Sequence, residues 1–400
     1  MVYHSIRVGT EGQPRSSKAA RRSRWWRVFI ILAVGLATSA CSLLIDFGAY
    51  RPSGAADAAD GEPSDANADA DDDGGSCDAS DHLSDPNNCG ACGRVCIEGP
   101  GSCDAGRCPL TSLFDEDAGA VQALALPSRA DAGTYLYFTT GDAFVGRRSL
   151  GTGTIEKSLT NGASARAVAV NAGGTLGVAA TGGKTIATFE ESKFAVQPLS
   201  PISTDHTGLG ALWLAGAEVF WGDSEGVWWS STAPDASAGG GPDAGSATPV
   251  AFAESNGNVL WITSGGTVFS ADAANPGRVT RLVAGGTETF SCLAVSRTYL
   301  YVCEKTPLGG GVVVYAVANL GVPLRTIALV DPQAVVTDGQ YVYVVDYRSK
   351  LANDSRLVRA KADGTQSVVL ADGFRSSRGL AVDQEWVYFG DGPRILRTSK

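Results

Sequence analysis

The sequence predicts an all-β fold, a seven-bladed β-propeller, and three observations support it. First, a segment of aromatic and β-branched residues such as "TYLYFTTGD" (134–142) recurs through residues 111–400. Second, the copies lie 40 to 45 residues apart, counted from the aligned positions Leu136, Leu176, Val219, Val259, Leu300, Val342 and Val387. Third, 50 glycines and a single methionine favour turns over packed helices. Units of this length with four short strands are typical of propeller blades.

The strands of each unit follow from short apolar runs bounded by Gly, Asp and Asn. Small apolar strands precede most copies: "ALAL" (123–126), "AVAV" (167–170), "ALWL" (211–214), "CLAV" (292–295) and "GLAV" (379–382). The last unit ends after its third strand. An open sheet edge is an aggregation hazard, so we expect "TSLFDE" (111–116) to supply the missing strand and close the ring.

Two cysteines lie inside the fifth unit. Cys292 and Cys303 stand at mirror positions about a turn at residues 297–298. A close antiparallel pair brings such positions within disulfide range, so we expect them to be bonded across the hairpin.

The repeat also resembles a known family. The copies "YLYFTTGD", "VFWGD" and "WVYFGDG" resemble the YWTD-type propeller repeats of low-density-lipoprotein-receptor ectodomains and of bacterial proteins with a similar pattern. The resemblance implies the architecture of residues 110–400 and no particular ligand, because propellers carry many unrelated functions.

The N-terminus has the pattern of an export signal, with a basic segment, then "VFIILAVGLATSA" (28–40) and Cys41. It resembles a bacterial lipoprotein signal, which implies that residues 1–40 are removed and that Cys41 is lipidated. By analogy, Ser42 implies sorting to the outer membrane. Two alternatives stay open: cleavage after "TSA" without a lipid, and an uncut anchor over residues 28–45. In all three, the basic flank places residues 42–400 outside the cytoplasm.

The charge balance limits the partners. Residues 1–40 hold seven basic residues and one acidic residue, so the remainder has 25 basic and 41 acidic residues and a formal charge of −16. This balance argues against nucleic acid and anionic membrane surfaces as partners. We expect the acidic, Ala/Gly/Pro/Ser-rich segment 41–76 to be a disordered tether. Within it, Asp69, Asp71 and Asp73 match the start of a calcium loop, but Ser80 stands where a bidentate Glu is expected, which favours a plain spacer.

Residues 77–109 form a cysteine-rich module that is too short for a hydrophobic core. It holds six cysteines: Cys77, Cys89, Cys92, Cys96, Cys103 and Cys108. Their even number and an oxidising compartment predict three disulfides of open connectivity. A zinc site on Cys89, Cys92, Cys103 and Cys108 is the alternative. The run "DPNNCGACGRVC" followed by "CDAGRC" resembles small modules of myxobacterial exported proteins and of plant stigma-specific proteins, which implies an extracellular adaptor without chemistry.

Catalytic groups are sparse. Outside the signal the chain has two histidines, His82 and His206, in different predicted domains. A carboxylate-only site remains conceivable on the acids that follow the second strand of four blades: Asp142, Asp223, Asp346 and Asp391. The simpler interpretation is that each Asp caps a turn. We therefore predict no enzyme and no cofactor.

The candidate binding residues are tryptophans. Blades 3 and 4 hold five of the eight: Trp213, Trp221, Trp228, Trp229 and Trp261. Exposed Trp rings stack on sugars and anchor peptides, whereas core packing is the alternative. The alternation in "GVWWSS" predicts that one of Trp228 and Trp229 points into the blade packing. A polar insertion at 233–249 is expected to be a surface loop.

Taken together, these patterns predict a monomeric, lipid-anchored envelope protein that uses its propeller to bind an extracellular protein or glycan. One alternative is a structural envelope scaffold without a discrete ligand. The other is a carboxylate- and calcium-dependent hydrolase.

Overall fold

The computed structural model describes residues 84, 89, 96, 103, 107–115, 119–127, 135–141, 144–159, 165–181, 184–195, 200–203, 208–233, 239–241, 248–283, 289–306, 309–348, 354–375 and 378–400. Residues 71–400 form one compact unit, and the other unit, residues 1–70, lies outside the described residues. The same is true of several predicted sites: Cys41, Asp69, Asp71, Asp73, Cys77, Cys92 and Asp142. Within the described part, no helix is long and apolar enough to span a bilayer.

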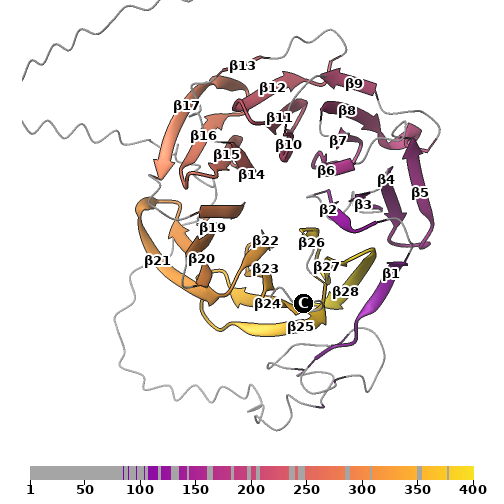
Figure 1. The fold of residues 1–400 in the computed structure, drawn as a ribbon, viewed down its shortest axis with the longest axis vertical. Helices are drawn as coiled ribbons and strands as arrows, with labels where there is room; N and C mark the ends of the chain where they lie inside the picture. The colour runs from indigo at the N-terminus through magenta and orange to yellow at the C-terminus, as the bar shows by residue number, and fades with distance from the viewer. Residues whose placement is uncertain are drawn as a thin grey trace, which may run out of the picture. The chain divides into compact units, whose positions relative to one another are not determined.

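Seven four-stranded antiparallel sheets surround a common centre, and each is one blade (Figure 1). The innermost strands are β2 (Val121–Ala125), β6 (Ala165–Val170), β10 (Ala211–Ala215), β14 (Pro249–Ser255), β18 (Thr289–Val295), β22 (Pro332–Thr337) and β26 (Leu380–Val382). The second strands are β3 (Tyr135–Thr140), β7 (Leu176–Thr181), β11 (Glu218–Gly222), β15 (Asn258–Thr263), β19 (Tyr299–Thr306), β23 (Tyr341–Tyr347) and β27 (Trp386–Asp391).

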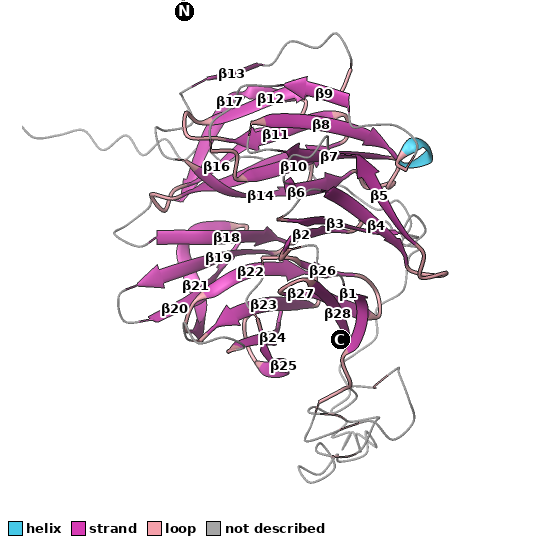
Figure 2. Cartoon of the chain, turned by 45° about the vertical axis from the view of Figure 1, so that its right-hand side comes forward, coloured by secondary structure: helices cyan, strands magenta, loops and turns pink. Residues whose placement is uncertain are grey.

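The outer half of each blade is built the same way. The third strands are β4 (Phe144–Ser149), β8 (Thr185–Glu190), β12 (Val227–Ser231), β16 (Val268–Asp272), β20 (Gly309–Ala316), β24 (Ser355–Lys361) and β28 (Arg394–Ser399). The outermost strands are β5 (Ile155–Leu159), β9 (Ser200–Ser203), β13 (Gly239–Gly241), β17 (Asn275–Val283), β21 (Asn319–Leu329), β25 (Val368–Phe374) and β1 (Thr111–Asp115). Figure 2 shows the blades obliquely, with the short 3-10 helix η2 (Glu191–Lys193) at the periphery.

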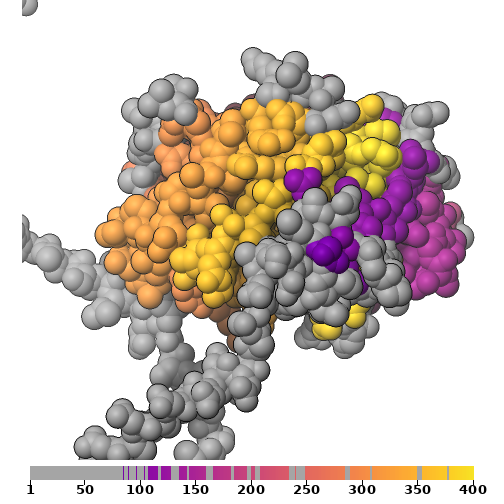
Figure 3. All heavy atoms as spheres, turned by 90° about the horizontal axis from the view of Figure 1, so that it is seen from below, coloured from indigo at the N-terminus to yellow at the C-terminus, as the bar shows by residue number. Residues whose placement is uncertain are grey.

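The ring closes through the N-terminal strand of the propeller, as the sequence predicts. β1 pairs antiparallel with β28, placing Thr111 opposite Arg397 and Asp115 opposite Arg394. The seventh sheet therefore has the order β1-β28-β27-β26. In Figure 3, indigo atoms from this early segment lie beside yellow atoms of the C-terminal blade. The closure pairs an edge that the last blade would otherwise expose.

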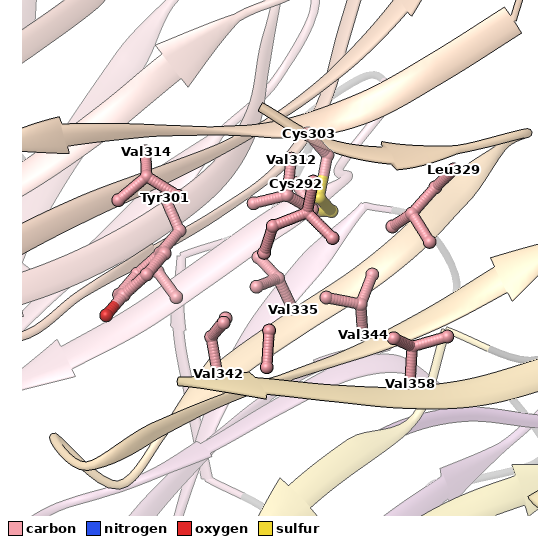
Figure 4. Close-up of a cluster of buried hydrophobic side chains, with 13 residues drawn as sticks. Cys292, Tyr301, Cys303, Val312, Val314, Leu329, Val335, Val342, Val344 and Val358 are labelled. Atoms are coloured by element: carbon pink, nitrogen blue, oxygen red, sulfur yellow. A yellow bond between two sulfur atoms is a disulfide. The ribbon is translucent and has the colours of Figure 1, made fainter. Parts of the chain in front are cut away.

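The core consists of apolar side chains packed between neighbouring blades. The second strands are covered on both faces, so β27 is buried along its whole length, whereas the outer strand β21 is mostly exposed. This burial explains why the second strands read as continuous apolar runs rather than as alternating ones. Figure 4 shows one such cluster, in which Val312 and Val314 of blade 5 face Val342 and Val344 of blade 6.

The cysteines form disulfides. Cys292 lies directly opposite Cys303 in the β18–β19 ladder, and the two are bonded, which confirms the prediction for this hairpin. Their Cα atoms are 4.9 Å apart, within the ordinary range for a disulfide.

The cysteine-rich segment is also disulfide-bonded. Cys89 pairs with Cys103 and Cys96 pairs with Cys108. Two of the four residues of the alternative zinc set, Cys89 and Cys103, are thus bonded to each other. A zinc ligand must be a free thiolate, so these two sulfurs do not fit that set. The structure supports the disulfide interpretation of this segment.

Candidate functional site: the central cavity

A cavity of about 1210 Å³ lies at the centre of the ring, lined by residues of the innermost strands of all seven blades. In Figure 1 the labelled strands β2, β6, β10, β14, β22 and β26 lie nearest the centre, and β18 holds the same place in the order of its sheet. All seven run in the same sense through their blades, so the cavity has two distinct mouths. One is formed where the innermost strands begin and the other where they end.

β-bulges shape the first mouth. In five innermost strands the pairing register shifts by one residue at an equivalent position, which leaves one extra residue in each strand: Gln122, Arg166, Val250, Ser291 and Gln333. In the other two blades Gly210 and Arg378 occupy this level. A bulge redirects the side chain of its extra residue, and all seven residues line the cavity.

We call these seven residues the arginine mouth. Three of its polar side chains are bonded locally: Gln122 Nε2 donates to the Ala120 carbonyl at 3.3 Å, Ser291 Oγ donates to the Pro332 carbonyl at 2.9 Å, and Gln333 Nε2 donates to Asp331 Oδ1 at 2.6 Å. Arg166 and Arg378 are exposed, and neither forms an ion pair with any residue that the structure describes. This mouth therefore presents two guanidinium groups to the cavity.

The opposite mouth, which we call the aspartate mouth, contains Asp338, Gln340, Asp383, Gln384, Glu385 and Lys400. Asp338 follows β22 and caps the turn into β23. Its Oδ1 accepts the backbone N–H groups of Gln340 at 2.9 Å and Tyr341 at 2.7 Å. Its Oδ2 accepts the Tyr343 hydroxyl at 2.9 Å and lies 2.5 Å from Lys400 Nζ. The carboxylate is thus saturated by the fold.

Asp383 has the same role in blade 7. Its Oδ1 accepts the backbone N–H groups of Glu385 at 2.9 Å and Trp386 at 2.8 Å. Its Oδ2 accepts the Tyr388 hydroxyl at 2.6 Å. Lys400 links the two blades, because its Nζ also donates to the Asp383 carbonyl at 2.9 Å.

These contacts shift the pKa values at the aspartate mouth. Burial alone raises the pKa of Asp338, but the hydrogen bonds from Lys400 and from the backbone outweigh it, so the pKa is lowered overall. Burial raises the pKa of Tyr343 well above its usual value, and the negative charge of Asp338 raises it further. Burial and the hydrogen bond to Asp383 do the same for Tyr388. Both tyrosine hydroxyls therefore stay protonated and donate hydrogen bonds to the carboxylates.

The structure separates the five candidate tryptophans. Trp213 on β10 lines the cavity and is partly exposed, and its Nε1 donates to Glu254 Oε2 of the next blade at 3.2 Å. Trp221 and Trp261, at 0% and 1% exposed, are buried in the blade packing, where a surface ligand cannot reach them. Trp261 stacks on Phe269 with the ring centroids 5.7 Å apart.

The positions of Trp228 and Trp229 on β12 differ from the sequence prediction. We predicted that only one of them points into the blade packing, but both do. Trp228 packs against the cluster that contains Trp221, and Trp229 packs against the cluster that contains Phe220. The alternation of the strand is as predicted, but a neighbouring blade covers each face of blade 3. Both rings therefore stay partly buried.

Trp213 is unusual among its structural equivalents. At the same level of the innermost strand, the other blades have Ala125, Ala169, Ala253, Ala294, Val336 and Ala381. Small residues at this level keep the centre of the ring open. Trp213 is the one large side chain there, so it sits between the two mouths as a distinct feature of the cavity wall.

Three of the four acids proposed for a carboxylate-only site lie among the described residues, and each has a structural role. Asp223 Oδ1 accepts the backbone N–H groups of Glu225 and Gly226 at 2.7 and 3.1 Å. Asp346, at 0% exposed, accepts the N–H groups of Val330 and Asp331 at 3.0 and 2.8 Å and pairs with Arg356.

Asp391 repeats this arrangement in blade 7. It is buried, accepts the backbone N–H of Arg375 at 2.8 Å and pairs with Arg394. Asp346 and Asp391 thereby fix the segments that connect one blade to the next. The three described acids lie in three different blades, where they accept hydrogen bonds from the backbone of turns and of segments that connect blades. This arrangement agrees with the turn-capping interpretation.

Sequence reasoning missed the arginine mouth. Arg166 and Arg378 lie in different units, 212 positions apart, and neither belongs to a motif. A signal was present for Trp213, because "ALWL" has Trp where "ALAL", "AVAV", "CLAV" and "GLAV" have alanine. Only the pairing register of the innermost strands shows that the two arginines occupy one level of one cavity.

The fold and cavity define the class of the protein, a seven-bladed β-propeller, and such folds are in general interaction platforms. No family model matches the chain, and no curated protein matches it. Among solved structures, it is similar to U3-55K, with a TM-score of 0.58 and 12% identity over 73% of this chain and 98% of that one. It is also similar to the computationally designed Ika8 protein, with a TM-score of 0.50 and 13% identity over 72% of this chain and 99% of that one. At these identities the similarity shows the fold alone.

Proposed function

We propose that this protein is an exported, lipid-anchored envelope protein whose propeller binds an extracellular protein or glycan. In this proposal, residues 1–40 are a signal, 41–76 a tether from lipidated Cys41, 77–109 a disulfide module and 110–400 the binding domain. The observation that carries the binding function is the central cavity, whose arginine mouth and Trp213 are available for contacts. Three disulfides among the described cysteines support an oxidising compartment.

The first experiment tests export and anchoring by unreduced peptide mass spectrometry on protein from native bacterial membranes. The proposal expects a chain that begins at a triacylated Cys41, with Cys292 linked to Cys303. A Cys41→Ser variant, in which no lipid can be attached, is the control. An intact N-terminus or free thiols at Cys292 and Cys303 would refute this part of the proposal.

The second experiment separates a binding protein from a structural scaffold. A photo-crosslinking amino acid is placed at the arginine mouth, at Gln122, and on the outer strand β17, at Gly277, which has open space around it. A binding protein yields a discrete crosslinked species from position 122 and none from position 277. Crosslinks from both positions to many envelope components would favour the scaffold.

A further inference from the structure

Two residues of the cavity wall depart from the repeat: Arg166 of the arginine mouth and Trp213, whose ring is partly exposed although it packs against the cluster that contains Phe220 and Phe252. Arg166 belongs to blade 2 and Trp213 to blade 3, and these blades are neighbours in the ring (Figure 1). Gly210 occupies in blade 3 the level that Arg166 occupies in blade 2. Trp213 is three residues further along the same strand, which places it about 10 Å deeper in the cavity at the usual rise per residue.

Gly210 leaves the path to Trp213 open. A Cβ atom at this position would meet only two backbone oxygens, those of Gly208 and Pro249, at 3.9 Å, which is ordinary contact. The backbone of Gly210 is not in the left-handed region, so no conformational need explains the glycine. The arginine mouth therefore has a gap at blade 3, between Arg166 and Val250 and above Trp213.

We infer that the arginine mouth and Trp213 form a binding site for an acidic saccharide, with a sugar ring stacked on Trp213 and carboxylates held by Arg166 and Arg378. This inference rests on the proposed function and names its ligand class. The guanidinium group matches a carboxylate with two parallel hydrogen bonds, which gives both strength and orientation. An aromatic ring offers a large, rigid apolar surface.

Three further observations support a saccharide as the ligand. The bond from Trp213 Nε1 to Glu254 orients the indole before any ligand arrives, which lowers the entropy cost of binding. The arginine mouth also carries Gln122, Ser291 and Gln333, in blades 1, 5 and 6, whose side-chain oxygens can accept hydrogen bonds from hydroxyl groups. The alanines at the level of Trp213 form no deep apolar pocket of the kind that anchors a peptide side chain.

Calorimetric titration of the full chain tests this site with a panel of acidic oligosaccharides: oligogalacturonate, hyaluronan fragments and sialyllactose. Methyl-esterified oligogalacturonate is the matched neutral probe, and hexaglutamate is the matched acidic peptide. At least one acidic saccharide should bind, and Arg166→Gln and Arg378→Gln should each weaken it roughly tenfold through loss of a charge-assisted hydrogen bond. Trp213→Ala should abolish binding.

The gap at Gly210 provides an independent test. Gly210→Leu fills the path to Trp213 and should abolish binding while leaving the thermal midpoint unchanged. Gly277→Leu, on the outer strand β17 where a Cβ meets nothing within 4 Å, is the control and should bind normally.

Three results would overturn the inference: no acidic saccharide of the panel binds, binding is insensitive to Arg166→Gln and Gly210→Leu, or hexaglutamate binds with the same sensitivity to these variants. The last result would assign the site to an acidic peptide. If the saccharides fail while Cys41 is lipidated and position 122 crosslinks to one protein, only this inference falls. If lipidation and crosslinking also fail, the proposed function falls with it.

Discussion

The two mouths of the central cavity use charge in opposite ways. At the aspartate mouth, Asp338 and Asp383 are each bonded to two backbone N–H groups and a tyrosine hydroxyl, and Lys400 joins blade 6 to blade 7. At the arginine mouth, Arg166 and Arg378 are exposed and have no ion-pair partner among the described residues. Charges at the first mouth stabilise the blades, and charges at the second are available to a ligand.

This difference indicates how to separate structural from functional charge in a repeat protein. An acid that caps a turn recurs in neighbouring blades with the same partners, as Asp338–Tyr343 and Asp383–Tyr388 do. The arginines differ from their equivalents in the other blades, which are glutamine, serine, valine and glycine. Recurrence indicates folding, and departure from the repeat indicates a role of the individual blade.

The largest effect expected is on stability at the aspartate mouth. Asp383→Ala leaves two N–H groups and the buried Tyr388 hydroxyl without their acceptor, which should cost about 3 kcal/mol in the free energy of unfolding. Urea unfolding measures it. Glu385→Ala, an exposed residue at the same mouth, is the control and should change stability by less than about 0.5 kcal/mol. Equal effects of the two variants would remove the structural role assigned to Asp383.

A smaller effect is expected from the tyrosine partners. Tyr343→Phe keeps the packing and removes one hydrogen bond to Asp338, so the loss should be about 1 kcal/mol. A double-mutant cycle with Asp338→Ala isolates this pair, and the coupling energy should be of the same size. A coupling near zero would show that the hydroxyl and the carboxylate act independently.

The contribution of Asp338 should depend on pH. Its pKa in the folded state is below the unfolded value of 3.8, so its stabilisation is present above that value and is lost as pH falls through the folded pKa. The difference in unfolding free energy between wild type and Asp338→Asn should stay constant from about pH 7 to pH 5 and shrink below about pH 4. A difference that grows on acidification would contradict the lowered pKa.

The smallest effect is expected at the arginine mouth. Arg166→Gln and Arg378→Gln should each change the free energy of unfolding by less than about 0.5 kcal/mol, because neither guanidinium has a described ion-pair partner to lose. Thermal and urea unfolding of both variants measure this. A loss of 2 kcal/mol or more would mean that these arginines also stabilise the fold, and the contrast between the two mouths would fail.

Much of the fold is readable from local sequence. The spacing of the repeats predicts the seven blades, and the incomplete last unit predicts that residues 111–116 close the ring. The mirror positions of Cys292 and Cys303 predict their bond. One alignment differs by a residue in blade 2, where the register makes Gly177, not Leu176, the equivalent of Leu136. Gly177 contributes no apolar side chain to the sequence pattern, and the Phe189 ring occupies the space that a side chain at this position would fill.

The sequence by itself therefore determined the blades, their order, their closure and the disulfide of blade 5, because all of these follow from period-2 patterns and spacings within one or two units. Only the tertiary structure decided which of five tryptophans lines the cavity, and that Arg166 and Arg378 lie at one mouth while Asp338 and Asp383 are saturated at the other. These facts depend on bulges that redirect single side chains and on a closed ring that brings blades 7, 1, 2 and 3 together. The bulges do not follow from the local pattern of the chain, and the levels that different blades share across the ring are set only when the blades pack together.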